Sequence, residues 1–183
     1  SKLITLHSIT AKPKVRDNKT LSPEEREFFS KKEYNAFVDD AYLLMGKAHF
    51  YKHEYGLASD IFRKDINDFR NQPAVYEAQV WLSRVAIINK QYIEASEILS
   101  VLNNNASFPE KLLPELFTTY ADYYFKQKDF ANGINFLEKT LELEKKKKSR
   151  TRYLFILAQS YEKTGDLKRA SDYYEQVVKM NPA

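Results

Sequence analysis

The chain has 183 residues, of which 43% are hydrophobic and 30% are charged, a composition typical of a folded globular protein. It contains no cysteine, which excludes disulfides, thiolate metal sites and a cysteine nucleophile. Lysine and arginine outnumber aspartate and glutamate by 29 to 25, and the two signs are interleaved along the chain. No apolar run approaches the about 18 residues of a membrane-spanning helix, and no signal peptide is visible.

Residues 1–37 differ in pattern from the rest of the chain. Residues 1–7 look like the end of a helix, and residues 8–20 are polar and basic, as in a loop. The run Ser22-Pro23-Glu24-Glu25 then has the residues of a capped helix start. We therefore predict a helix stub, a loop and a short capped helix before the main body of the protein.

Residues 38–183 contain an internal repeat. Four copies start near residues 39, 76, 114 and 151, and each has small residues at its eighth and twentieth positions with large residues around them. Small residues there let two antiparallel helices approach closely, and such a pair buries its apolar face only by stacking on neighbouring pairs. The small residues are Gly46 and Ala58, Ser83 and Ala95, Ala121 and Gly133, and Ala158 and Ala170.

This pattern resembles the tetratricopeptide repeat (TPR), a helix–turn–helix unit of about 34 residues. The resemblance implies an all-α fold, a right-handed α-α superhelix (a TPR solenoid) with about four helix–turn–helix repeats in residues 38–183 and an N-terminal helix before them. The alternative is an ordinary helical bundle with accidental spacing. Because no polar capping helix follows the last repeat, we expect the native protein to continue beyond Ala183.

Three stretches carry a narrower resemblance. Asn35–Lys52, Val178–Pro182 and the upstream Leu6–Ile9 are similar to the large TPR lipoproteins of type IX secretion and gliding motility, of the SprE and PorW kind. The resemblance implies that this chain is the N-terminal repeat region of a longer lipoprotein. It also implies a component of a secretion machine on the periplasmic side of the outer membrane. The lipid-bearing cysteine of that family is not in this chain.

In this repeat class a partner usually binds along the concave groove, on positions 2, 5, 6, 9, 12 and 13 of the first helices. We therefore expect a scaffold that binds a protein or peptide in that groove. Trp81 is the single tryptophan, and tryptophan and arginine are enriched at binding hot spots, so Trp81 is the predicted apolar anchor. Lys47 and Arg84 would pair with acids of the partner. The alternative is that Trp81 packs between repeats. The candidate partner-binding residues are Lys47, Tyr51, Trp81, Arg84, Ile88, Asp122 and Phe155.

Catalytic and metal-binding patterns are missing from the sequence. There is no nucleophile elbow, phosphate loop or dinucleotide motif, so we expect no enzyme activity and no cofactor. His49 and His53 are four residues apart, which on a helix would place both on one face and allow them to chelate zinc. Phe50 stands where a metalloprotease helix would carry its glutamate, and no third ligand is obvious. We therefore expect no metal.

Lys145–Lys148, with Arg150 and Arg152, form the one dense basic cluster. It offers the alternative function, a basic helical-repeat module that binds nucleic acid through phosphate contacts. The simpler interpretation is a solvated helix end whose cations oppose the negative pole of the helix dipole. We therefore expect no nucleic acid as partner, and membrane attachment only through parts of the protein outside this chain.

Overall fold

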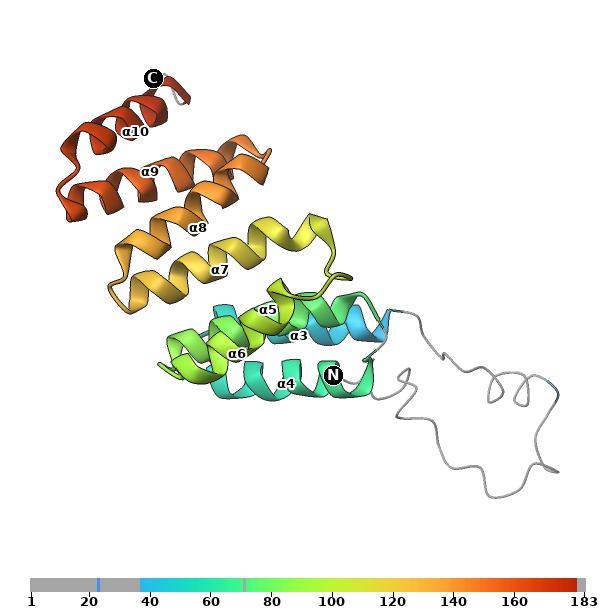
Figure 1. Ribbon diagram of the computed structural model, residues 1–183. Helices are drawn as coiled ribbons and strands as arrows, with labels where there is room; N and C mark the ends of the chain where they lie inside the picture. The colour runs from blue at the N-terminus through green and yellow to red at the C-terminus, as the bar shows by residue number, and fades with distance from the viewer. Residues whose placement is uncertain (1–22, 24–36, 71, 181–183) are drawn as a thin grey trace. The chain divides into compact units, whose positions relative to one another are not determined.

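The computed structural model describes residue 23, residues 37–70 and residues 72–180. Within these residues the chain forms eight α-helices and one short 3-10 helix, and it forms no strand (Figure 1). The predicted all-α class is therefore confirmed. The helix stub, the basic loop and the capped helix predicted before residue 37 fall outside the described residues, except for Pro23.

The helices alternate along the chain between first and second members of a pair. The first helices begin within a few residues of the predicted repeat starts. The chain divides into two compact units, and the boundary between Leu82 and Ser83 lies inside one helix. The first helices are α3 (Val38–Tyr51), α5 (Ala74–Ile88), α7 (Leu113–Lys126) and α9 (Lys147–Thr164). The second helices are α4 (Tyr55–Asp68), α6 (Tyr92–Asn103), α8 (Phe130–Leu143) and α10 (Leu167–Met180), and the 3-10 helix η3 spans Glu110–Leu112.

The first unit contains α3, α4 and the beginning of α5. α3 and α4 pack against each other where Gly46 meets Phe62. A Cβ atom added to Gly46 would lie 2.4 Å from the Phe62 ring, so only glycine allows this approach. Ala58 and Phe62 are completely buried. The close helix contact predicted from the small residues is confirmed for this pair.

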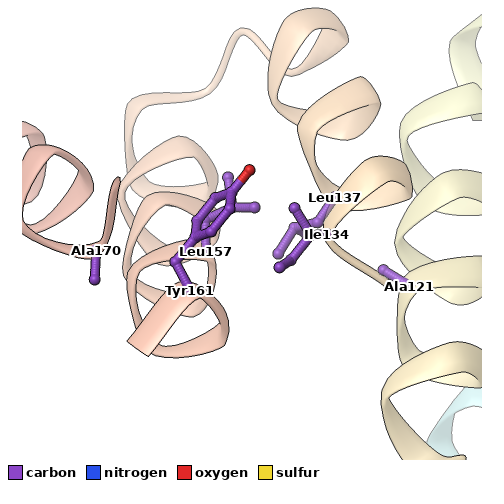
Figure 2. Close-up of a cluster of buried hydrophobic side chains, with 6 residues drawn as sticks. All are labelled: Ala121, Ile134, Leu137, Leu157, Tyr161 and Ala170. Carbon is purple, nitrogen blue, oxygen red and sulfur yellow. The ribbon is translucent and has the colours of Figure 1, made fainter. Parts of the chain in front are cut away.

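The second unit contains the end of α5 and all helices from α6 to α10. Each helix from α6 onward contacts the next, and α7 to α10 form two successive hairpins (Figure 1). Figure 2 shows the core of these hairpins, where Leu157 and Tyr161 of α9 face Ile134 and Leu137 of α8. Ala121 and Ala170 complete this buried cluster from α7 and α10. Two of the predicted small residues, Ala121 at an eighth position and Ala170 at a twentieth, thus lie inside it.

All four first helices end with the same backbone geometry. One or two residues after the last residue of each first helix, the backbone has a left-handed conformation. The φ angle is 63° at His53, 61° at Lys90, 64° at Lys128 and 84° at Gly165. At the end of α7, the Lys128 N–H donates to the Phe125 carbonyl and the Asp129 N–H donates to the Tyr124 carbonyl. This pair of bonds defines a Schellman motif, and equivalent bonds close the other three helices. Identical helix ends are expected of copies of one structural unit.

Candidate binding surface

The two cations predicted to bind a partner are held by acids of the same chain. The Lys47 ammonium contacts the Glu77 carboxylate within the first unit. In the second unit, Arg84 Nη1 donates to Glu115 Oε1 at 2.9 Å and Arg84 Nε donates to Thr119 Oγ1 at 2.9 Å. The sequence predicted that Lys47 and Arg84 would pair with acidic residues of a partner. This prediction is corrected, because each of the two cations already forms an ion pair with a glutamate of its own chain.

The two ion pairs involve the same positions of the repeat. In both pairs the ninth residue of one repeat meets the second residue of the next repeat. At the third junction the signs are reversed, with Asp122 at the ninth position and Arg152 at the second. Desolvation by the surrounding protein raises the pKa of the Asp122 carboxyl, and the positive charges of Arg84, Arg152 and Lys126 oppose this effect. The ninth and second positions thus carry opposite charges at all three junctions.

Trp81 is buried and does not serve as an exposed anchor. Its side chain is 5% exposed and its ring contacts three aromatic rings of α3 and α4. The centroid distances are 5.1 Å to Phe50, 5.6 Å to Tyr51 and 6.4 Å to Phe62, and Lys47 Nζ lies 5.3 Å from the Trp81 ring. The alternative interpretation, packing between the first and second repeats, describes this residue.

Large apolar side chains are nevertheless exposed on the first helices. In the described part of these helices they are Leu44 (64% exposed), Tyr51 (70%), Ile88 (37%) and Phe155 (44%). All four occupy positions at which a groove was predicted, namely 5, 6 and 13 of their repeats. Leu44 and Tyr51 belong to the first unit, and Ile88 and Phe155 belong to the second. We refer to these four residues as the first-helix apolar positions.

The histidine pair does not lie on one helix face. α3 ends at Tyr51, and His53 occupies the left-handed position of the following turn. His49 Nδ1 lies 2.5 Å from Glu54 Oε2, whereas His53 Nδ1 lies 2.7 Å from the Tyr55 hydroxyl. The geometric assumption behind the zinc hypothesis was therefore wrong. The residues that the structure describes contain no group of three or more metal-ligating side chains.

The lysine run lies at the turn between two helices. α8 ends at Leu143 and α9 begins at Lys147, so the run Lys145–Lys148 spans the turn and the first residues of α9. Lys145 and Lys146 directly follow the end of α8, which is the negative pole of that helix, whereas Lys147 and Lys148 lie at the positive pole of α9, so the predicted role at the negative pole is wrong for Lys147 and Lys148. Arg150 takes that role, because its Nη1 donates to the carbonyls of Leu141 (2.5 Å) and Glu144 (2.9 Å) at the end of α8. All four lysines are exposed.

A pocket lies away from the predicted surface and was missed from the sequence. It has a volume of about 360 Å³ and lies between α6 and α7, next to the turn that precedes α8. The one sequence signal that could have indicated this pocket is the dense group of tyrosines at Tyr120, Tyr123 and Tyr124 in α7. We refer to it as the tyrosine pocket. Its lining residues are Ser96, Ser100, Tyr120, Tyr123, Tyr124, Gln127 and Asp129.

Known proteins share this architecture. Residues 113–183 match the family model described as tetratricopeptide repeat. The solved structure of MamA 41-end from Desulfovibrio magneticus RS-1 is similar, with a TM-score of 0.61 and 20% identity over 87% of this chain and 85% of that chain. A putative kinesin light chain with nearly identical TPR-like repeats from Podosopora anserina has a TM-score of 0.58 and 19% identity, covering 88% of this chain and 78% of that chain.

Two further searches gave no match, one among curated proteins and one for membrane-spanning helices in the described residues. None of the helices in the described ranges combines the length and the apolar character that crossing a bilayer requires. The chain is thus an all-helical repeat protein with the fold of TPR arrays, and its residues 113–183 match the model of that family.

Proposed function

We propose that this chain is a non-catalytic scaffold that binds a partner protein along its first helices. The observation that carries the proposal is the exposure of the first-helix apolar positions Leu44, Tyr51, Ile88 and Phe155. Helical-repeat proteins bind partners on extended surfaces formed by successive repeats, and the centres of protein interfaces are apolar and aromatic. Exposed apolar side chains at the groove positions fit such an interface.

The junction charges have a supporting role in this proposal. Lys47 with Glu77, and Arg84 with Glu115, join neighbouring first helices and fix their spacing. Partly exposed ion pairs of this kind contribute little net stability, but they set register between the elements that they join. They therefore shape the surface that a partner would meet, whereas the apolar side chains would supply the contact energy.

The cellular setting is a further part of the proposal. The similarity of Asn35–Lys52 and Val178–Pro182 to type IX secretion and gliding-motility lipoproteins supports a place in a bacterial envelope secretion or motility assembly. The chain would then act on the periplasmic side of the outer membrane. Attachment to that membrane would come from parts of the protein outside this chain.

Site-specific photo-crosslinking in cells that naturally express the protein tests the proposal. A benzoylphenylalanine placed at Tyr51 or Phe155 should crosslink a partner protein, whereas the same probe at Ile93 or Val101 should not. The control positions are exposed large apolar residues of the second helix α6, so they match the test positions in chemistry and exposure. The crosslinked partner should be identified by mass spectrometry as an envelope secretion or motility component.

Two results would contradict the proposal. Crosslinks from Ile93 and Val101 with none from Tyr51 and Phe155 would move the interface to the second helices. A crosslinked partner that belongs to no envelope assembly would leave the scaffold proposal standing and remove the cellular setting.

The exposed Lys145–Lys148 run keeps nucleic acid as the second candidate partner. Binding through these lysines would release counterions, so affinity for a fluorescent single-stranded RNA should fall steeply as salt increases. Replacing all four lysines by glutamine should then abolish binding. Binding that is weak at low salt and unchanged by this replacement would exclude the lysine run as a nucleic-acid site.

A further inference from the structure

The tyrosine pocket has the size of a site for one side chain of a ligand. All of its lining residues belong to the second unit, so its walls are formed within one compact body. Its volume of about 360 Å³ lies at the lower end of the about 300–1,000 Å³ that is typical of small-ligand sites.

The aromatic walls of the pocket are held by further ring contacts. Tyr120 and Tyr124 stack on Phe136, with centroid distances of 4.4 Å and 5.7 Å. Tyr123 stands at 80° to Tyr124, with the two centroids 5.1 Å apart, and it is supported from its other side by Tyr92. Burial, together with the neighbouring phenols, raises the pKa of Tyr120 to about 12, so its hydroxyl stays neutral. Tyrosine rings fixed at steep angles to each other form the kind of wall that attracts a cation.

Ser96 and Gln127 supply the pocket with hydrogen-bond acceptors. The Ser96 hydroxyl donates its proton to the Ile93 carbonyl at 2.8 Å. Gln127 Nε2 donates to the Tyr123 carbonyl at 3.3 Å, and Gln127 Oε1 is a further acceptor. The Ser96 oxygen and Gln127 Oε1 retain lone pairs, so the pocket can accept hydrogen bonds from a ligand that brings donors of its own.

The pocket also carries one negative charge and no positive charge. Asp129 Oδ1 accepts from the Asn132 N–H at 3.1 Å, and Asp129 Oδ2 accepts from Asn132 Nδ2 at 2.6 Å. These bonds lower the pKa of the Asp129 carboxyl, which is therefore ionised at neutral pH. No lysine or arginine is among the lining residues, although Lys126 and Lys128 are close along the chain.

We propose that the tyrosine pocket binds an arginine side chain of a partner protein. A guanidinium group stacks on aromatic rings, brings five N–H donors in one plane, and is less strongly hydrated than an ammonium group. Each of these properties has its complement here: the rings of Tyr123 and Tyr124, the acceptors Ser96 and Gln127, and the anion Asp129. An ammonium group would match the charge but would use fewer of the acceptors.

This inference rests on the proposed function as a partner-binding scaffold, but it concerns other residues. The tyrosine pocket uses no first-helix apolar position. The crosslinking experiment can therefore fail while the pocket binds arginine, and the pocket can fail while the crosslinks form.

An NMR titration of the ¹⁵N-labelled 183-residue chain tests the proposal. The probe is the blocked peptide acetyl-Gly-Arg-Gly-amide, compared with the same peptide carrying lysine or citrulline. Citrulline has nearly the shape of arginine without its charge. The arginine peptide should shift amide signals of residues 96–100 and 120–129 with a dissociation constant of about 1–10 mM, as expected for one small ligand group. The lysine peptide should bind about 5-fold more weakly or worse, and the citrulline peptide should not saturate.

Two aspartate variants separate charge from helix capping. Asp129→Asn removes the charge but keeps an oxygen that can cap α8, because asparagine caps helices as well as aspartate. It should weaken arginine binding about 10-fold. Asp166→Asn makes the same change at the aspartate whose Oδ1 accepts from the Arg169 N–H at 3.1 Å; Asp166 is not among the residues that line the pocket, so this change should leave binding unchanged.

Each remaining outcome would overturn the proposal. Equal shifts with the citrulline peptide would show that charge is not recognised. Absence of localised shifts up to about 30 mM arginine peptide, well above the expected constant, would show that the pocket does not take this group. Equal weakening by Asp129→Asn and Asp166→Asn would assign the effect to helix capping or net charge. Saturable shifts at the pocket with a blocked tetraproline peptide, and none with the arginine peptide, would replace arginine by a proline-rich ligand.

Discussion

Asp65 is a carboxyl group that the first unit buries without a hydrogen-bond partner. Both of its side-chain oxygens are buried and accept no hydrogen bond within the part of the chain that the structure describes. Burial, and then the charges of Asp39, Asp40 and Asp68, raise its pKa from the ordinary 3.8 to about 7. The neighbouring Lys64 is already bound to Asp68 at 2.6 Å. Asp65 therefore prefers to be protonated in the folded state.

This preference predicts that the first unit loses stability as pH rises. Between pH 3.8 and about 7 the folded chain holds the Asp65 proton and the unfolded chain releases it, so the folded state binds more protons. The free energy of unfolding should fall by about 1.4 kcal/mol per pH unit across this window, and by up to about 4 kcal/mol in total. Asp65→Asn should remove this dependence.

Urea unfolding at several pH values, followed by the fluorescence of Trp81, measures the effect. Trp81 is the single tryptophan and lies in the same unit as Asp65. The difference in unfolding free energy between the native chain and Asp65→Asn should decrease steadily from pH 4 to pH 7. A constant difference over this range would show that Asp65 does not hold its proton.

Two glycines of the first unit have opposite surroundings and predict opposite mutational effects. Gly46→Ala places a Cβ atom 2.4 Å from the buried Phe62 ring, and overpacking of this kind costs about 1–3 kcal/mol. Gly56→Ala in α4 meets no atom within 4 Å, and alanine favours a helix over glycine by up to about 1 kcal/mol. Urea unfolding monitored by Trp81 should therefore show a less stable Gly46→Ala chain and a more stable Gly56→Ala chain. Stabilisation by both changes would mean that the two helices can separate at no cost.

For individual residues, the sequence predicted contacts between helices better than contacts with a partner. Gly46 and Ala58 were correctly placed at a close helix contact, because small residues at fixed spacing have one main structural cause. Arg84 was assigned to a partner, and Trp81 either to a partner or to packing between repeats, because both residue types are common in interfaces. The same types also suit a contact between repeats, and only distances to Phe50 and Glu115 distinguish the two roles.

The four first helices end in the same left-handed conformation, but with different residue types. Glycine is the residue that most easily adopts the left-handed conformation, and only the fourth Schellman end has it, at Gly165. His53, Lys90 and Lys128 adopt the same conformation with a side chain. The sequence therefore contains the glycine signal for a helix end once in four repeats. This is why the end of α3 was missed and His53 was placed on the helix.

Strain at these ends predicts a gain in stability from glycine. Lys128→Gly should stabilise the second unit by about 0.5–1 kcal/mol, because a left-handed conformation is unfavourable for residues with a Cβ atom. Ala131→Gly, at an exposed position within α8, should instead destabilise it by up to about 1 kcal/mol. Thermal unfolding followed by circular dichroism measures both variants. A loss of stability in both would indicate that the lysine side chain supports the turn by more than the conformation costs.

The sequence around the lysine run does not show where one helix stops and the next one starts. Lysine is a good helix former, and no capping residue stands between Leu143 and Lys147 to show where α8 stops and α9 starts. The pattern therefore allowed a helix end as well as a helix start. The hydrogen bonds of Arg150 to the carbonyls of Leu141 and Glu144, which locate the end of α8, depend on the folded turn.

For the whole molecule, the division into two units suggests how unfolding should spread. In repeat proteins each repeat contacts mainly its neighbours, so stability is close to a sum over repeats and the junctions between them. One buried cluster of the second unit contains Leu137 and Leu157, which are almost completely buried, and the members of this cluster come only from α7 to α10. Damage to this core should therefore remain local.

Leu157→Ala tests this locality. Truncation of a buried leucine costs about 2–5 kcal/mol through lost burial and the cavity that remains. Hydrogen exchange measured by mass spectrometry should accelerate about 30-fold or more in peptides from α8, α9 and α10, because exchange follows the free energy of local opening. Peptides from α3 and α4, whose packing centres on Phe62 in the first unit, should exchange at their original rates. A similar acceleration in both units would contradict local unfolding, because it requires that the two units open as one cooperative body.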